Sequence, residues 1–221
     1  MSDPPADRPG ETEPGAAPDP PAGYGPPWRF AYPALGVNLL AATLTVVSLA
    51  GFGWLALALR RADLLAWVVV TDTPDGVVLN LGGVAVAFVV GFLLAVPLHE
   101  AVHGAVATAF GYRVSYGVAT NVGGVYAAAF GQFQPREHLI PVALAPLVVL
   151  DAVGVALVAF APAPVAAGAV GALVVNTSGA AGDLYATTVA LRTPPGTLFY
   201  DVDMRNSYVF EPAGEGDGAR R

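Results

Sequence analysis

Four long stretches without charge constrain the fold more than any other feature of this sequence. Residues 34–59 and 77–98 contain no charged side chain, and residues 139–160 and 165–191 contain one acid each. A helix that crosses a membrane needs about 20 mostly apolar residues, so each stretch is long enough to cross. The sequence therefore predicts an all-α membrane protein with about four transmembrane helices.

The composition supports this class and excludes others. Hydrophobic residues make up 55% of the chain and charged residues 12%, which is about half the charged share of an ordinary soluble domain. The chain has no cysteine, which excludes thiol catalysis and cysteine-ligated metal clusters. The net charge is −7 without a single lysine, so no basic surface is expected to bind nucleic acid.

The two ends differ from the region between them. Residues 1–29 are acidic and rich in proline, a composition that cannot bury enough apolar surface to fold, so we predict a disordered tail. Residues 211–221 are predicted to form a flexible C-terminal tail. The membrane domain is expected to span residues 30–210, and the short apolar run at 64–70 is expected to be interfacial or re-entrant.

A small β-hairpin is predicted between the second and third spans. Residues 112–118 and 125–130 are rich in β-branched and aromatic side chains, and residues 121–124 between them have turn chemistry. Arginines flank the spans more often on the side that would hold both termini. The positive-inside rule then predicts a multi-pass protein of the cell membrane with both termini in the cytoplasm.

The motif His99-Glu100-Ala101-Val102-His103 stands at the end of the second span. Residues four apart lie on one face of a helix, so both imidazoles can reach one metal ion. Glu100 lies beside them and can accept a proton from a water that the metal activates. Ionisable residues within a span are costly and mark functional sites. The pattern predicts a catalytic zinc centre with His99 and His103 as ligands and Glu100 as general base.

Depth in the membrane favours Asp183 as the third ligand. His103 lies ten residues before Arg113, and Asp183 lies nine residues before Arg192, so both sit roughly 15 Å from the same membrane side at about 1.5 Å per residue. Asp151 and Glu137 remain alternatives as ligands. His138 is expected to have a surface or interfacial role.

Asn176 lies two turns before Asp183 in a segment of small residues. Small residues allow helices to approach closely, so Asn176 either supports helix packing or binds substrate.

These motifs resemble those of the putative zincin peptidases, short membrane proteins long catalogued as a domain of unknown function. The resemblance rests on His99–His103 at the end of a span and on Asn-x-x-Gly-x-x-Gly-Asp, residues 176–183, in the last span. More distantly, the chain is similar to the site-2 protease clan of intramembrane metalloproteases. The resemblance implies that His99, His103 and Asp183 hold Zn²⁺ and that Glu100 is the catalytic acid and base.

The sequence thus predicts an intramembrane zinc metallopeptidase that hydrolyses membrane-embedded or membrane-tethered protein substrates. Two other classes stay open. One is a non-catalytic zinc-binding scaffold or regulator, which the presence of Glu100 disfavours, since a structural zinc site needs no general base. The other is an ion or metal transporter that uses Asp151, Asn176 and Asp183 along a path. The sequence does not specify an oligomeric state.

Overall fold

The computed structural model describes residues 15–73, 76–119 and 124–214. Four helical segments in it are long and apolar enough to cross a membrane, and they match the predicted spans: Ala34–Val68, Leu81–Ala109, Arg136–Phe160 and Ala163–Arg192. In the most apolar 18-residue stretch of each segment, at most 44% of the residues are buried. Many large apolar side chains of the first three segments are exposed, as expected for contact with lipid. The structure is mostly helical, as predicted, but it also contains a four-stranded sheet and a second hairpin that the all-α prediction did not include.

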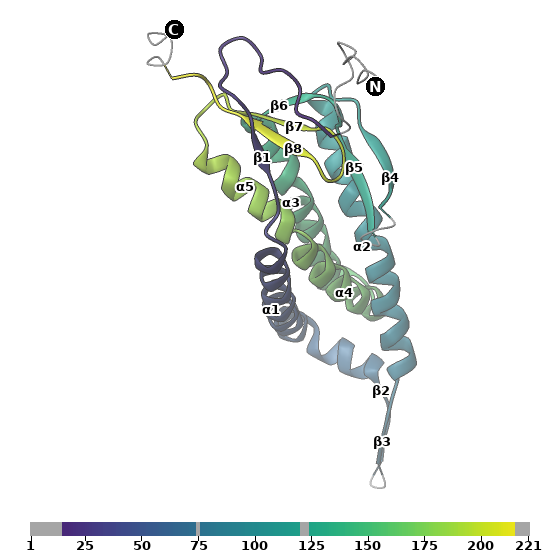
Figure 1. The fold of residues 1–221 in the computed structure, drawn as a ribbon. Coiled ribbons are helices and arrows are strands. Elements are labelled where there is room, and N and C mark those ends of the chain that lie inside the picture. The colour runs from purple at the N-terminus through teal and green to yellow at the C-terminus, as the bar shows by residue number, and fades with distance from the viewer. Residues whose placement is uncertain (1–14, 74–75, 120–123, 215–221) are drawn as a thin grey trace, which may run out of the picture.

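The central helix is α4 (Ala163–Gly179), which packs against α1 (Ala34–Val68), α2 (Leu81–Ala109) and α3 (Arg136–Phe160) (Figure 1). Its residues Ala169, Val170 and Leu173 form a buried apolar cluster with Ala56 of α1 and Val158 of α3. On its other side, Gly168 lies against the backbone of α2 at Ala87. Small side chains on α4 let three helices approach it closely, as is common in membrane proteins.

The first helix is longer than its predicted span. It continues beyond residue 59 and bends at Arg60, whose backbone leaves the helical region with φ −136°. The Arg60 side chain donates hydrogen bonds to the carbonyl oxygens of Ala159 (3.1 Å) and Ala161 (2.9 Å) at the end of α3. After the bend, residues 61–68 form the last part of α1, so most of the run at 64–70, predicted to be interfacial or re-entrant, is helical. The hairpin of β2 (Val69–Thr73) and β3 (Gly76–Leu79) follows.

The fourth predicted span is two helices rather than one. Helix α4 ends at Gly179, and α5 (Ala181–Arg192) begins two residues later in a different direction (Figure 1). The residues around this break are small, Gly179-Ala180-Ala181-Gly182, so the chain can turn next to neighbouring helices. The break places Asp183 in the first turn of α5, where the helix N-terminus favours a negative charge.

A four-stranded antiparallel sheet covers one end of the helices (Figure 1). Its strands, in spatial order, are β1 (Trp28–Phe30), β8 (Ser207–Phe210), β7 (Leu198–Asp201) and β6 (Phe133–Pro135). Phe30, Phe199 and Val209 of the sheet pack on Ala186 and Ala190 of α5. The apolar contact fixes the sheet on α5, close to Asp183.

The N-terminal tail is ordered in part, contrary to the prediction of disorder through residue 29. Trp28–Phe30 pairs with β8, and Tyr24 forms an isolated bridge with Pro212. The Tyr24 hydroxyl also donates a hydrogen bond of 2.9 Å to the carbonyl oxygen of Gly196. Aromatic residues near the end of the tail supply the contacts that its proline-rich composition lacks. Residues 1–14 and 215–221 lie outside the described residues.

The predicted β-hairpin between the second and third spans is confirmed. It consists of β4 (Ser115–Ala119) and β5 (Gly124–Ala128), which pair antiparallel with Tyr116 opposite Ala127. Tyr116 lies over Gly104 of α2, at a place where any larger side chain would collide with the phenol ring. The hairpin thus lies along the helix that carries the histidine motif. Residues 120–123 of the predicted turn lie outside the described residues.

Substitution of Gly91 should destabilise the helix packing. A Cβ at Gly91 would collide with the carbonyl oxygen of Gly168, so α2 and α4 would have to separate in the Gly91→Ala variant. We expect a loss of about 1–3 kcal/mol, typical of overpacking, measured as a lower thermal midpoint in detergent. Gly82→Ala in the same helix is the control, because a Cβ there meets nothing within 4 Å. Equal midpoints for the two variants would contradict this account.

Candidate metal centre

The structure brings His99, His103 and Asp183 together between α2 and α5. The two histidine Nε2 atoms lie 3.1 Å apart. Asp183 Oδ2 lies 3.1 Å from Nε2 of His99, and Asp183 Oδ1 lies 3.3 Å from Nε2 of His103. One possible ligand atom from each residue thus lies within 4.8 Å of the others. All three residues predicted to hold the metal converge on one point.

Asn176 determines which nitrogen of His99 faces that point. The Asn176 amide nitrogen donates to the carbonyl oxygen of Pro146 (3.1 Å) and to Asp151 Oδ1 (2.9 Å). Both partners only accept hydrogen bonds, so the amide oxygen of Asn176 must be the atom 2.9 Å from His99 Nδ1. Nδ1 of His99 therefore carries the proton, and Nε2 presents its lone pair to Asp183 and His103.

The orientation of His103 depends on a proline in α3. Its Nδ1 lies 2.8 Å from the carbonyl oxygen of Val142, which accepts a hydrogen bond. In a regular helix that carbonyl would bind the amide of residue 146, but Pro146 has no N–H. The free carbonyl of Val142 instead holds the imidazole of His103 with its Nε2 toward the site.

The donor set fits a metal cation. Two imidazole nitrogens and a carboxylate converge at hydrogen-bond distance, and they repel one another unless a proton or a metal cation lies between them. Each histidine donates a hydrogen bond from its other ring nitrogen, Nδ1, to an oxygen. Such an oxygen is the usual outer partner of a metal-binding histidine. Two imidazoles and one carboxylate suit zinc, and three protein ligands leave one position for water, as in catalytic sites.

Glu100 lies next to these residues and is held by the hairpin. Its Oε2 accepts a hydrogen bond of 2.8 Å from the backbone N–H of Ala127 in β5. The amide of Ala127 therefore points away from β4 and toward the helix. Since β4 and β5 form a sheet of two strands, the other edge of β5 faces the candidate metal centre without a strand partner among the described residues.

A cavity of about 270 Å³ joins these groups, and its lining includes His99, Glu100, His103 and Asp183. The covering sheet contributes three further polar residues to it, Tyr32 just after β1, Gln134 in β6 and Asp201 at the end of β7. Burial raises the pKa of the Asp201 carboxyl. Desolvation, together with the carboxylates of Asp201 and Asp183, raises the pKa of the Tyr32 hydroxyl. Tyr32 thus remains a neutral hydrogen-bond donor in the cavity.

The sequence analysis did not identify Tyr32 as a site residue. It stands at the boundary between the predicted tail and the first span, where nothing in the local pattern marks it. Tyr32 reaches the cavity because β1 pairs with β8. Its ring also packs against Phe30 and Tyr185, at centroid distances of 4.9 and 5.8 Å.

The alternative ligands lie in other surroundings. Asp151 accepts hydrogen bonds from Asn176 and from the Thr177 hydroxyl (3.0 Å), so it reaches His99 only through Asn176. Glu137 accepts a hydrogen bond of 3.2 Å from the backbone N–H of Gly196. His138 stacks on Phe110 at 4.2 Å and bonds the Tyr112 hydroxyl at 2.8 Å. None of the three belongs to the converging group.

The Asn176 side chain is held by other residues of the protein. Its side chain is 3% exposed, and its amide is bonded to His99, Pro146 and Asp151. These contacts indicate that Asn176 orients His99.

Comparison with known proteins finds a family that this region resembles. Residues 92–198 match the model of a family described as putative zincin peptidase. The matched segment contains His99, Glu100, His103 and Asp183, and the family description points to metallopeptidase activity and zinc. No curated protein and no solved structure matches the chain.

Removal of Pro146 should weaken metal binding. In the Pro146→Ala variant the new N–H can bind the Val142 carbonyl and compete with His103 for it. Loss of an outer partner of a metal-binding histidine typically costs about 10- to 100-fold in affinity, and we expect a change of this size in a zinc titration against a chelating dye. Pro141→Ala is the control, because it removes a proline from α3 without adding a donor at Val142. Unchanged zinc affinity in Pro146→Ala would rule out this role.

Proposed function

We propose that the chain is an intramembrane zinc metalloendopeptidase, similar in design to the site-2 proteases. The observation that carries the proposal is the convergence of His99, His103 and Asp183 beside Glu100, in a cavity lined by α2, α3, α4 and α5, which belong to three of the four long apolar segments. His99, His103 and Asp183 would hold zinc, which would polarise the substrate carbonyl and lower the pKa of a bound water, so that the water loses a proton more readily when it attacks.

Glu100 is the group that moves the proton. Its carboxylate accepts a proton from the attacking water and transfers it to the amine that leaves when the peptide bond breaks. The hydrogen bond from Ala127 holds the carboxylate at the cavity from the side of the hairpin. A purely structural zinc site would not need this acid, which disfavours the scaffold alternative.

The β5 edge supports an extended substrate. An edge strand can pair with a peptide through backbone hydrogen bonds, and Ala127, Ala128 and Ala129 line the cavity with small side chains. A substrate helix would have to unwind to pair there, which exposes its peptide bonds to Glu100. The proposed substrates are membrane-embedded or membrane-tethered proteins. The proposal also places the protein in the cell membrane with both termini in the cytoplasm.

Reconstituted protein tests the proposal. Zinc-loaded protein in vesicles should cleave synthetic apolar transmembrane peptides or β-casein, and a zinc chelator should abolish the cleavage, which added zinc then restores. Cleavage that persists in the chelator, or zinc-loaded protein that cleaves none of these probes, would contradict the proposal.

A further inference from the structure

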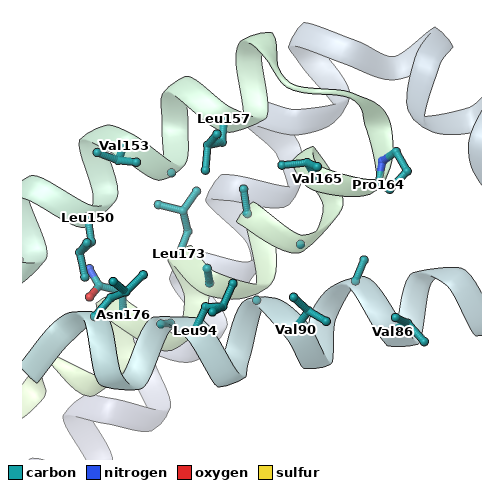
Figure 2. A pocket seen from close by; sticks show the side chains of 18 of the residues that line it. Val86, Val90, Leu94, Leu150, Val153, Leu157, Pro164, Val165, Leu173 and Asn176 are labelled. Atoms are coloured by element: carbon teal, nitrogen blue, oxygen red, sulfur yellow. The ribbon is translucent and has the colours of Figure 1, made fainter.

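The cavities of this structure differ in whether their polar groups have partners within the protein. The largest cavity, about 570 Å³, lies between α2, α3 and α4, and Asn176 is the polar side chain that Figure 2 labels in its lining. The Asn176 amide is already bonded to His99, Pro146 and Asp151. The other side chains labelled in Figure 2 are apolar, so none of the labelled groups needs a polar ligand.

Gln134 in β6 is a buried polar residue in a different position. It lines the cavity of about 270 Å³ that contains Glu100 and Asp183, which we call the catalytic cavity. Gln134 is 4% exposed, yet its side-chain amide has no hydrogen bond to any group in the described part of the chain. A primary amide has two N–H donors and an oxygen acceptor, and buried polar groups are nearly always hydrogen-bonded. This amide is therefore available to whatever enters the cavity.

The register of the sheet points Gln134 toward the helices. Gln134 pairs with Phe199 of β7, and side chains directly opposite each other lie on one face of a sheet. Phe199 packs on Ala186 and Ala190 of α5, so this face is the one that covers the helices. Backbone pairing thus fixes the direction of the Gln134 side chain.

Tyr32 brings a phenol hydroxyl to the same cavity from the other end of the sheet, two residues after β1. Its ring lies against α5 at the residue before Asp183, since a Cβ at Gly182 would be 3.8 Å from Tyr32 Cε1. The carboxylates of Asp183 and Asp201 act electrostatically on the hydroxyl. Among the described residues, this hydroxyl has no hydrogen-bond partner either. It is a donor beside the candidate metal centre that no protein group occupies in the described part of the chain.

The two walls of the catalytic cavity differ in chemistry. The helix wall supplies the carboxylates of Glu100 and Asp183, which accept hydrogen bonds, and the N–H of Ala127 is already bonded to Glu100. The sheet wall supplies donors, the O–H of Tyr32 and the NH₂ group of Gln134. When water attacks a peptide bond, negative charge develops on the carbonyl oxygen, and donors aimed at that oxygen stabilise the transition state. Such donors are present on the sheet wall.

We propose that Tyr32 and Gln134 bind the substrate from the sheet wall of the catalytic cavity. The Tyr32 hydroxyl donates a hydrogen bond to the carbonyl oxygen of the cleaved bond as this oxygen becomes negative. The Gln134 amide pairs with a neighbouring peptide group of the substrate, through one N–H and its own oxygen. The inference rests on the proposed function and adds two residues to its site. Tyr32 precedes residues 92–198, the segment that matches the family model, so the strand before the first span contributes to the site.

Gln134→Met tests the amide, because methionine has a similar length and lacks the amide's donors and acceptor. The probe is a fluorescent synthetic apolar transmembrane peptide, reconstituted in vesicles with zinc-loaded protein that carries Glu100→Gln, so that it binds without being cleaved. We expect Gln134→Met to raise the Kd of the probe about fivefold, as for the loss of a hydrogen bond. The thermal midpoint should stay equal or rise, since no hydrogen bond within the protein is lost. An unchanged Kd, or a lower midpoint as the single effect, would overturn the role of Gln134.

Tyr32→Phe tests the hydroxyl alone. Loss of one donor to the charged oxygen typically lowers kcat about 10²- to 10³-fold, and we expect a fall of this size with KM and zinc content unchanged. Tyr185→Phe is the matched control, because its ring packs on Tyr32 at 5.8 Å but does not line the catalytic cavity. A phosphinic analogue of the probe, whose anionic oxygen imitates the charged carbonyl oxygen, should bind about tenfold more weakly to Tyr32→Phe than to Tyr185→Phe. Equal kcat and equal analogue affinity in the two variants would overturn the role of Tyr32.

The binding experiment separates this inference from the proposed function. Binding of the probe needs no cleavage, so weaker binding by Gln134→Met, in a protein whose wild type cleaves nothing, would contradict the peptidase alone. Unchanged Kd and kcat in variants of an active, zinc-loaded protein would contradict the contacts from the sheet wall alone.

Discussion

Replacement of Asp183 by alanine is expected to remove zinc from the protein. Asp183 is the single carboxylate that lies within 3.3 Å of both histidine Nε2 atoms in the described part of the chain. Loss of one of three protein ligands should lower zinc affinity on the order of 10²- to 10³-fold. Elemental analysis of detergent-purified protein should find about one zinc per chain in the wild type and far less in Asp183→Ala.

Asp151→Asn is the matched control for this experiment. Asp151 is also an acid within a span, but it binds Asn176 and Thr177 rather than a histidine, and asparagine keeps an oxygen that accepts their hydrogen bonds. We expect this variant to retain zinc. The ligand assignment would be wrong if Asp151→Asn lost zinc and Asp183→Ala kept it. A wild type without metal under non-chelating conditions would contradict the zinc site itself.

Replacement of Glu100 by glutamine should separate metal binding from catalysis. Glutamine has the same shape, and its amide oxygen can still accept the hydrogen bond from Ala127, so the fold and the zinc content should not change. It cannot take up the proton of the attacking water. General acid–base catalysis is worth about 10²- to 10⁴-fold in rate, and we expect kcat to fall by that amount.

The measurement combines zinc content with cleavage of a probe that the wild type hydrolyses. Full zinc occupancy with strongly reduced cleavage assigns Glu100 to proton transfer. Wild-type cleavage by Glu100→Gln would exclude that role, and a zinc-free variant would instead place Glu100 among the groups that hold the metal.

Local features of the sequence predicted a large part of this arrangement. The four spans follow from apolar length alone, and the i, i+4 spacing of His99 and His103 puts both imidazoles on one face of α2. The hairpin at β4 and β5 follows from its strand-forming residues. In each case hydrogen bonds between near neighbours in the sequence set the geometry, so a short window contains the information.

Other features depend on contacts between distant segments. The sequence could not show that Asp151 lies behind Asn176, because residues 151 and 176 are on different helices whose rotation is set by packing. The estimate of depth in the membrane left both Asp151 and Asp183 as candidates for the third ligand, because it gives the height of a residue along a helix but not the direction of its side chain. The break between α4 and α5 also arises among small residues that are equally compatible with one continuous helix.

The sequence by itself determined four segments long and apolar enough to cross a membrane, the histidine motif with its neighbouring glutamate, and the residues able to complete a metal site. The tertiary structure decided which of these residues meet. It freed the Val142 carbonyl for His103 through Pro146 and brought Tyr32 to the cavity by pairing β1 with β8. Helical periodicity is set by local backbone hydrogen bonds, whereas the rotation and approach of helices depend on the side chains that they present to one another.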